Sequence, residues 1–108
     1  MDGTAAVQST GSALSNDQLK VMIVDDSAVI RGIFRRTLEA DDEIEVIASV
    51  SNGKQAVDAL AKHKVDVIVL DIEMPVMDGM TALPLLLEAA PDVKIIMAST
   101  LTEKNAAV

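Results

Sequence analysis

The chain has 108 residues, half of them hydrophobic but only one aromatic, which suits one small domain with an aliphatic core and is short for two domains. The net charge of −8 argues against nucleic acid and anionic membrane surfaces as partners, because both attract basic proteins. Without cysteine, the chain can form neither disulfides nor thiolate metal sites.

Residues 1–18 are small and polar and show no periodic pattern, which predicts a disordered tail before a domain of residues 19–108. This segment lacks the basic flank and apolar core of a signal peptide. No apolar run in the chain approaches the ~18 residues of a membrane span. A cytoplasmic location is therefore expected.

Apolar runs and helical periodicities alternate after the tail. Runs rich in β-branched residues predict four strands, over residues 20–25, 44–50, 66–70 and 93–98. The second run has the mixed character of an edge strand, whereas the third is apolar throughout, as in a strand buried on both faces. Helical spacing predicts three intervening helices, and Thr102 could cap a fourth. The alternation predicts an α/β fold with one open parallel sheet and right-handed crossovers.

Each helix is expected to bury one face. In the first helix, from Ser27 to about Ala40, the predicted stripe consists of Ile30, Ile33, Phe34, Thr37 and Leu38. The arginines that lie off this stripe, and that we expect in solvent, are Arg31, Arg35 and Arg36. The third helix shows apolar residues at helical spacing at Leu83, Leu86, Leu87 and Ala90. This helix should start near Thr81, because Pro84 is tolerated only in a first turn.

Two of the predicted strands end in carboxylates. Asp25 and Asp26 follow the first strand, and Asp71 ends the third. Parallel strands share one carboxyl edge, so these three acids are expected to meet there when the first and third strands are neighbours in the sheet. Like charges that close cannot all stay ionised without a counter-charge, so either protons or a cation should be present. His63, the only histidine, has no second His or Cys beside it and is expected at the surface.

An oxygen-only ligand set favours Mg²⁺ among the common protein metals. A carboxylate next to that ion can act as the nucleophile towards a phosphoryl group, forming an aspartyl phosphate, and Asp71 is the candidate. Ser99, at the end of the fourth strand, is placed to donate a hydrogen bond to a phosphoryl oxygen.

Response-regulator receiver domains are the family that residues 20–108 resemble. The resemblance rests on the segments VMIVDDSAVIR, VIVLDIEMPVMDGM and IIMAST. The shorter segments DDSAVIR, DIEMPVMDG and STLTEK are especially similar to the receivers of chemotaxis protein-glutamate methylesterases. The resemblance implies a flavodoxin-like fold with sheet order 2-1-3-4-5.

The resemblance also implies roles for individual residues. Asp71 would accept a phosphoryl group from a histidine kinase, and Ser99 would be the switch hydroxyl. Asp25 and Asp26 would hold Mg²⁺ directly or through water, and the backbone carbonyl of Glu73 would complete the protein ligands.

The family's fifth strand, with its invariant lysine and its switch aromatic, has no counterpart in these residues, so the expected sheet order is 2-1-3-4. Lys104 falls at the start of the predicted fourth helix and cannot replace that lysine. The fourth strand is then an edge, which predicts self-association through it, or a chain that is a fragment of a longer protein. Methylesterase activity is not expected, because the chain has no G-x-S-x-G elbow.

Three functions remain open on these grounds. The first, which we favour, is a chemotaxis-type signalling receiver whose phosphorylation switches an interaction surface. The second is a Mg²⁺-dependent phosphohydrolase with Asp71 as nucleophile, but enzymes resembling the haloacid dehalogenases place an Asp where this chain has Glu73. The third is a truncated receiver that is not phosphorylated and serves only as a protein-interaction module.

Overall fold

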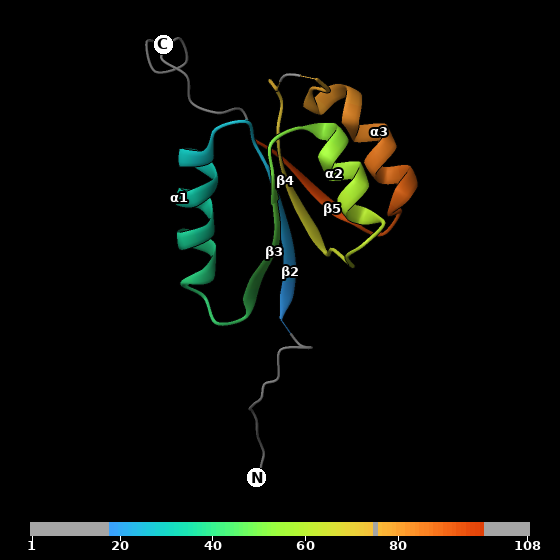
Figure 1. Ribbon diagram of the computed structural model, residues 1–108. Helices are drawn as coiled ribbons and strands as arrows, with labels where there is room; N and C mark the ends of the chain where they lie inside the picture. The colour runs from blue at the N-terminus through green and yellow to red at the C-terminus, as the bar shows by residue number, and fades with distance from the viewer. Residues whose placement is uncertain (1–17, 75, 99–108) are drawn as a thin grey trace.

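The structure, a computed structural model, describes residues 18–74 and 76–98. Its parallel strands are β2 (Leu19–Val24), β3 (Ile44–Val50), β4 (Val67–Asp71) and β5 (Lys94–Ala98). Its helices are α1 (Ala28–Glu39), α2 (Gly53–Leu60) and α3 (Gly79–Ala89). The strands form one sheet in the order β3-β2-β4-β5, which confirms the predicted order 2-1-3-4 (Figure 1).

Several sequence-based predictions concern parts of the chain outside the described residues. The predicted tail over residues 1–18 is described only at Gln18. The residues of the predicted switch and of the predicted fourth helix are also outside, among them Ser99, Thr102 and Lys104. In the part of the chain that is described, no helix is long and apolar enough to cross a bilayer.

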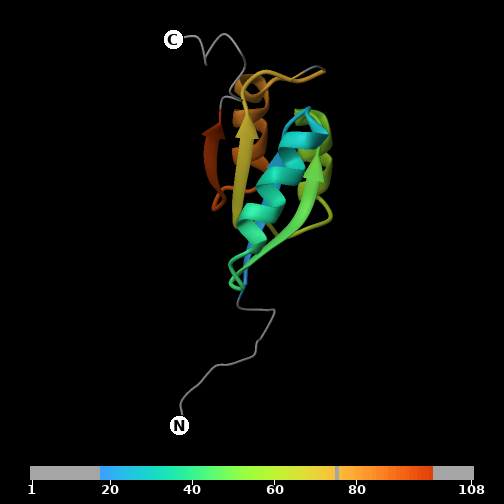
Figure 2. The same ribbon diagram turned by 90° about the vertical axis from the view of Figure 1, so that its left-hand side faces the viewer.

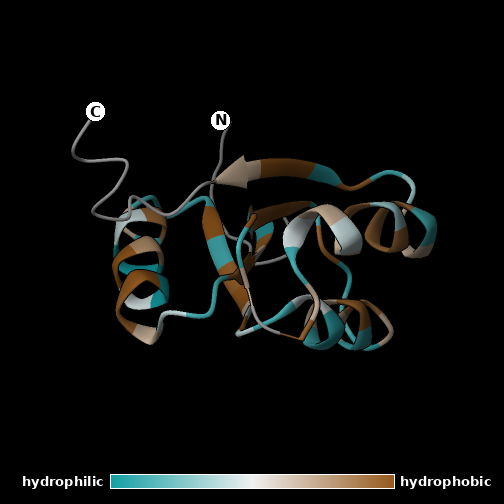
Figure 3. Ribbon diagram, turned by 90° about the horizontal axis from the view of Figure 1, so that it is seen from above, coloured by the Kyte–Doolittle hydropathy of each residue, from teal (hydrophilic) through white to brown (hydrophobic). Residues whose placement is uncertain are grey.

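The helices form two layers around the sheet. α1 lies alone on one face, whereas α2 and α3 lie side by side on the other (Figures 1 and 3). The view in Figure 2 looks onto α1, with β3 beside it and β5 at the far side of the sheet. Alternate residues of β2 point to opposite layers, since Met22 packs with the cluster under α2 and α3 and Ile23 with the cluster under α1. β2 and β4 are the two central strands of this sheet, and β3 is at an edge, as its mixed pattern predicts.

Each helix begins at a side chain that caps its first turn. The capping residues are Ser27, Asn52 and Asp78, whose side-chain oxygens accept hydrogen bonds of 3.2, 2.9 and 2.8 Å from the backbone N–H three residues further on. Such a cap is worth about 1 kcal/mol relative to alanine. All three caps follow the carboxyl end of a strand or the loop after it, so the helix starts are gathered at one edge of the sheet.

The predicted apolar stripe of α1 is only partly buried. Phe34 and Leu38 pack against the cluster on this face of the sheet, but Ile33 is 45% exposed and Thr37 is also exposed. The prediction for Ile33 and Thr37 is wrong. α1 is the only helix on its face in the described part of the chain, so the flank of its stripe that points away from the sheet has no neighbour to cover it.

α3 differs from its prediction in two ways. It begins at Gly79, not near Thr81, because Asp78 caps it there, and Pro84 is consequently its sixth residue rather than part of a first turn. Leu86 is fully buried as predicted, but Leu87 is 41% exposed. The buried position that the prediction missed is Ala82, whose small side chain lets α3 approach α2 closely.

Gly79 allows a close approach between α3 and the end of β4. Its backbone N–H donates a 2.8 Å hydrogen bond to the carbonyl of Ile72, which closes the loop after β4. A Cβ atom on this glycine would overlap the carbonyl oxygen of Asp71 and would lie 2.9 Å from the Cα of Ile72. Both obstacles are backbone atoms, so neither can move away by a side-chain rotation. The first turn of α3 therefore requires glycine at this position.

We predict that Gly79→Ala strongly destabilises the protein, because the added methyl group forces the loop after β4 away from α3. The strain should cost about 1–3 kcal/mol, in the range of overpacked cores. Thermal unfolding followed by circular dichroism measures this loss.

Gly32→Ala is the matched control. A Cβ atom at Gly32, inside α1, would be 3.7 Å from the nearest atom of Arg36, an ordinary contact. Replacing a helical glycine by alanine there should raise stability by up to about 1 kcal/mol. If Gly79→Ala melts at or above the parent temperature, the close contact described for Gly79 is wrong.

Candidate metal centre

Three carboxylates meet at the carboxyl edge of the sheet. β2 and β4 pair in parallel with Val24 opposite Leu70, so the residues that follow, Asp25 and Asp71, are neighbours. One carboxylate oxygen from each of Asp25, Asp26 and Asp71 lies within 4.8 Å of the other two. The predicted convergence of these acids at one edge is confirmed.

The three carboxylates differ in exposure. Asp25 is 2% exposed and Asp71 is 1% exposed, whereas Asp26 is open to solvent. Burial raises the pKa of Asp25 above its ordinary value, and the negative charges of Asp71 and Asp26 add to the rise. A hydrogen bond from the backbone of Ser27 and the charge of Arg31 act in the opposite direction.

Backbone N–H groups orient both buried carboxylates. The N–H of Ser27 donates to Oδ1 of Asp25 at 2.8 Å. The N–H of Glu73 donates to Oδ1 of Asp71 at 3.3 Å, a longer bond. Each donor lies two residues after its acceptor, so the chain's turn away from the strand end supplies the hydrogen bond. The first residues of each loop thus help to orient these two carboxylates.

Arg31 contributes to this edge of the sheet, contrary to its prediction as a solvent-facing residue. Its Nη1 donates a 2.6 Å hydrogen bond to the backbone carbonyl of Asp25, and its Nε donates a 3.0 Å bond to Oγ of Ser49 on β3. Arg35 and Arg36 are exposed as predicted. The sequence signal that could have identified Arg31 is its position four residues after the cap Ser27, which leaves it one turn from the strand end.

The donor set fits a small hard cation. All three candidate ligands are carboxylate oxygens, and Mg²⁺ prefers oxygen ligands and retains several waters. Two oxygens that both contact one Mg²⁺ at about 2.1 Å lie at most about 4.2 Å apart. One oxygen from each acid lies within 4.8 Å of the other two, close to this span, so the cluster has the size of a site for a single Mg²⁺.

The other predicted site residues are less well defined. Glu73 lies two residues after Asp71, and its side chain is exposed. The predicted metal ligand is its backbone carbonyl, and this role stays a prediction. Ser99 lies outside the described residues. The residue before it, Ala98, is paired with Asp71 across β4 and β5.

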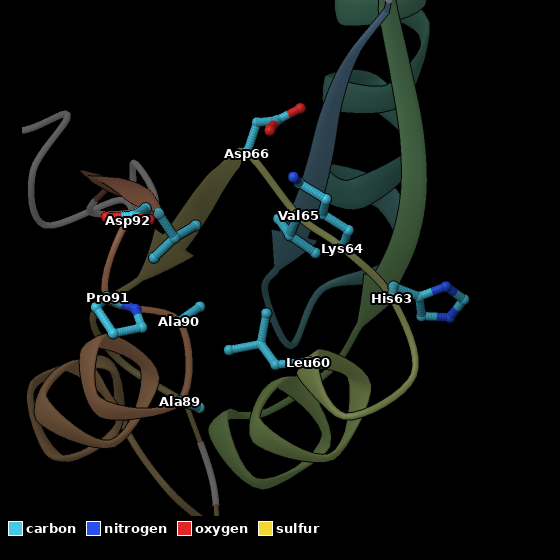
Figure 4. Close-up of a pocket in the computed structure, with 10 residues that line it drawn as sticks. Leu60, His63, Lys64, Val65, Asp66, Ala89, Ala90, Pro91 and Asp92 are labelled. Atoms are coloured by element: carbon cyan, nitrogen blue, oxygen red, sulfur yellow. The ribbon is translucent and has the colours of Figure 1, made fainter. Parts of the chain in front are cut away.

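A cavity of about 360 Å³ lies at the opposite edge of the sheet, before β4 and β5. Figure 4 shows Leu60, Val65 and Ala90 pointing into it, whereas the ring of His63 points away. His63 is exposed, as predicted. Asp66 also lines the cavity, but its carboxylate accepts a 2.9 Å hydrogen bond from the backbone N–H of Lys20 and so connects β2 to the segment before β4. We assign this cavity no role in the chemistry at the acidic edge.

Comparison with known families and curated proteins gives a consistent result. The family described as "Response regulator receiver domain" matches residues 21–108. A protein-glutamate methylesterase/protein-glutamine glutaminase of a group 2 operon from Rhodospirillum centenum is 60% identical over 97 residues, which cover 90% of this chain and 25% of that protein. The corresponding protein of Azospirillum brasilense is 64% identical over 97 residues and is covered to 24%. The chain thus spans about a quarter of the length of these relatives.

Solved structures have the same fold. The response regulator domain of Thermotoga maritima CheB superimposes with a TM-score of 0.73 at 36% identity, covering 81% of this chain and 64% of that one. The CheX-CheY-BeF3-Mg+2 complex from Borrelia burgdorferi gives a TM-score of 0.67 at 31% identity, covering 80% and 66%. The flavodoxin-like fold expected from the sequence is confirmed, together with the resemblance to methylesterase receivers.

We predict that Asp25→Asn raises the melting temperature of the metal-free protein at pH 7 by a few degrees. The folded-state pKa of Asp25 is raised, so the folded protein binds this proton more tightly than the unfolded chain does. Ionisation of Asp25 therefore costs stability above the folded-state pKa, and the cost disappears below the ordinary value of 3.8. The advantage of the variant should shrink accordingly as the pH falls, in melts with a chelator present.

Asp42→Asn, which changes an exposed aspartate away from the cluster, is the control and should leave the melting temperature unchanged. A metal-free Asp25→Asn protein that melts below the parent would contradict the mutual repulsion of these carboxylates.

Proposed function

The chain belongs to the response regulator receiver family, and from this premise we propose that Asp71 accepts a phosphoryl group in two-component signalling. The observation that carries the proposal is the convergence of Asp25, Asp26 and Asp71 within 4.8 Å at the carboxyl edge of a parallel sheet. Open α/β sheets bind their ligands at this edge. An acidic cluster that can hold Mg²⁺ beside a nucleophilic carboxylate suits phosphoryl transfer.

The proposed reaction is an in-line displacement. An oxygen of the Asp71 carboxylate forms a bond to phosphorus as the bond between phosphorus and the donor's leaving atom breaks, and the donor leaves with the bonding electrons. For a histidine kinase the leaving atom is an imidazole nitrogen. The N–H of Glu73, which donates to Asp71, holds the attacking group in one orientation, which favours an in-line approach.

The residues proposed to hold Mg²⁺ are Asp25 and Asp26, directly or through water, with Asp71 and the backbone carbonyl of Glu73. When bound, the ion supplies positive charge that stabilises the equatorial phosphoryl oxygens. The Borrelia relative, which was solved as a complex that includes BeF3 and Mg²⁺, supports the assignment of this metal.

A switch in an interaction surface is the proposed consequence of phosphorylation. Ser99 is the proposed switch hydroxyl, which would donate a hydrogen bond to a phosphoryl oxygen. The preceding residue, Ala98, is opposite Asp71 in the register of β4 and β5. This pairing supports the proposal that Ser99 acts together with Asp71.

The proposed partner is a histidine kinase of chemotaxis-type signalling. Support comes from the receiver family match and from the methylesterase relatives, which are 60% and 64% identical to this chain. The matched region of those relatives is about a quarter of their length, so we assign no esterase or glutaminase activity to the residues described.

We predict that Asp71→Asn abolishes phosphorylation and leaves the fold intact, because the amide has the size of the carboxylate but is not a nucleophile. The parent, incubated with a small phosphodonor and Mg²⁺, should gain the mass of one phosphoryl group, and the variant should gain none. Omission of Mg²⁺ or addition of a chelator should also prevent labelling of the parent.

Asp42→Asn serves again as the control and should be labelled like the parent. Labelling of Asp71→Asn, or labelling that needs no divalent ion, would refute the assignment. Repeated turnover of a phosphate monoester by the parent would favour the phosphohydrolase alternative, and a folded parent that takes no label would favour the interaction module.

Self-association through β5 is a second proposal about partners. β5 is an outer strand of the described sheet, and its residue Ile96 is 55% exposed. An apolar edge strand can pair with another chain through its free backbone groups. We predict that the chain forms dimers or larger species at micromolar concentration, measured by light scattering, and that Ile96→Lys shifts them towards monomer. A parent that is monomeric throughout this range would contradict the proposal.

A further inference from the structure

The guanidinium of Arg31 connects the ends of two strands. Arg31 is the half-buried fourth residue of α1, and its guanidinium contacts the carbonyl of Asp25 after β2 and the hydroxyl of Ser49 near the end of β3. The 2.6 Å bond to the carbonyl is short for an N–H to oxygen hydrogen bond, as expected for a charged donor. The two bonds come from different nitrogens of one planar guanidinium, Nη1 and Nε, which form a fork that a lysine side chain does not have.

The carbonyl that Arg31 binds belongs to the peptide unit between Asp25 and Asp26. A peptide unit is planar, so a bond that orients its carbonyl also orients the N–H and the Cα of Asp26. The carboxylate of Asp25 in turn accepts a hydrogen bond from the backbone N–H of Ser27. The short turn that carries two of the three clustered acids is thus held at its carbonyl by Arg31 and at its carboxylate by the backbone.

We propose that Arg31 is a positioning residue for the divalent-cation site, because its guanidinium holds the peptide between Asp25 and Asp26 so that both carboxylates converge on Asp71. This inference rests on the proposed Mg²⁺ site. It assigns Arg31 an effect on metal affinity through ligand geometry, with no contact to the metal or to the reacting atoms.

A role of Arg31 through its charge and a role through ligand positioning predict opposite changes in Mg²⁺ affinity when Arg31 is removed. The guanidinium is a cation close to a cation site, so its removal should strengthen Mg²⁺ binding if charge alone matters. If Arg31 positions two ligands, its removal should weaken binding, since loss of a partner that orients metal ligands typically costs 10- to 100-fold in affinity.

The experiment compares Arg31→Lys and Arg31→Gln with the parent chain by calorimetric titration of Mg²⁺ in the absence of any phosphodonor. Arg31→Lys keeps the charge and removes the fork, whereas Arg31→Gln removes both. Arg35→Gln is the matched control, because Arg35 is on the same helix, one turn later, and is exposed. Amide NMR spectra of the metal-free proteins report the turn directly.

For a positioning role we expect the Kd for Mg²⁺ to rise about tenfold in both Arg31 variants, the lower end of the typical range, with no change in Arg35→Gln. The metal-free amide signals of Asp26 and Ser27 should shift in both Arg31 variants and should stay in place in the control. Thermal unfolding identifies a variant that has lost its fold, and if Arg31→Gln is such a variant, Arg31→Lys decides the question.

Three results would overturn the inference. In the first, Arg31→Gln binds Mg²⁺ as tightly as the parent or more tightly, which indicates a role of charge alone. In the second, Arg31→Lys retains both the affinity and the amide positions of the parent, which shows that the fork is not needed. In the third, the parent itself has no measurable affinity for Mg²⁺, and the proposed metal site then fails along with its positioning residue.

Discussion

The parallel pairing of β2 with β4 is the constraint on which the rest of this molecule depends. Because Val24 is opposite Leu70, β2 and β4 end at the same edge of the sheet. The buried carboxylates of Asp25 and Asp71, which follow these residues, are therefore neighbours. Burying like charges together is unfavourable, and the fold compensates with a backbone N–H for each acid and with the guanidinium of Arg31. The backbone register therefore brings the acids together, and the surrounding N–H groups and Arg31 partly offset their repulsion.

The loop after β4 shows how packing supports this edge. Gly79 lets α3 begin directly against the backbone of Asp71, and the carbonyl of Met77 accepts a 3.1 Å hydrogen bond from the N–H of Gly53 at the start of α2. The loop is thus connected to two helices, and Asp26 is the acid of the cluster that is exposed to solvent.

The sequence by itself determined the strand and helix order and placed Asp25 and Asp71 at strand ends, whereas the sheet order that makes those strands neighbours came from the resemblance to receiver domains. Apolar runs that stop at acids place those acids at strand ends, and the parallel alternation brings strand ends of one sense to a single edge. The element order and the strand-end positions of the acids need only local pattern and chain connectivity. The faces of the second strand could not be read in this way, because its pairing with β2 shifts between Val21 and Met22. As a result, Val46 packs with the cluster under α1 and Ala48 with the cluster under α2 and α3.

Only the tertiary structure decided which helix residues are buried and what surrounds the acids. Helical periodicity shows that Ile33 and Leu87 belong to apolar stripes, but their burial depends on what packs against them, and they remain 45% and 41% exposed. In the same way, an arginine off the stripe looks solvent-facing until the adjacent strand is in place, and Arg31 reaches Ser49, 18 residues away along the chain. A pattern within one element records which side is apolar, whereas burial and hydrogen bonding are properties of two elements together.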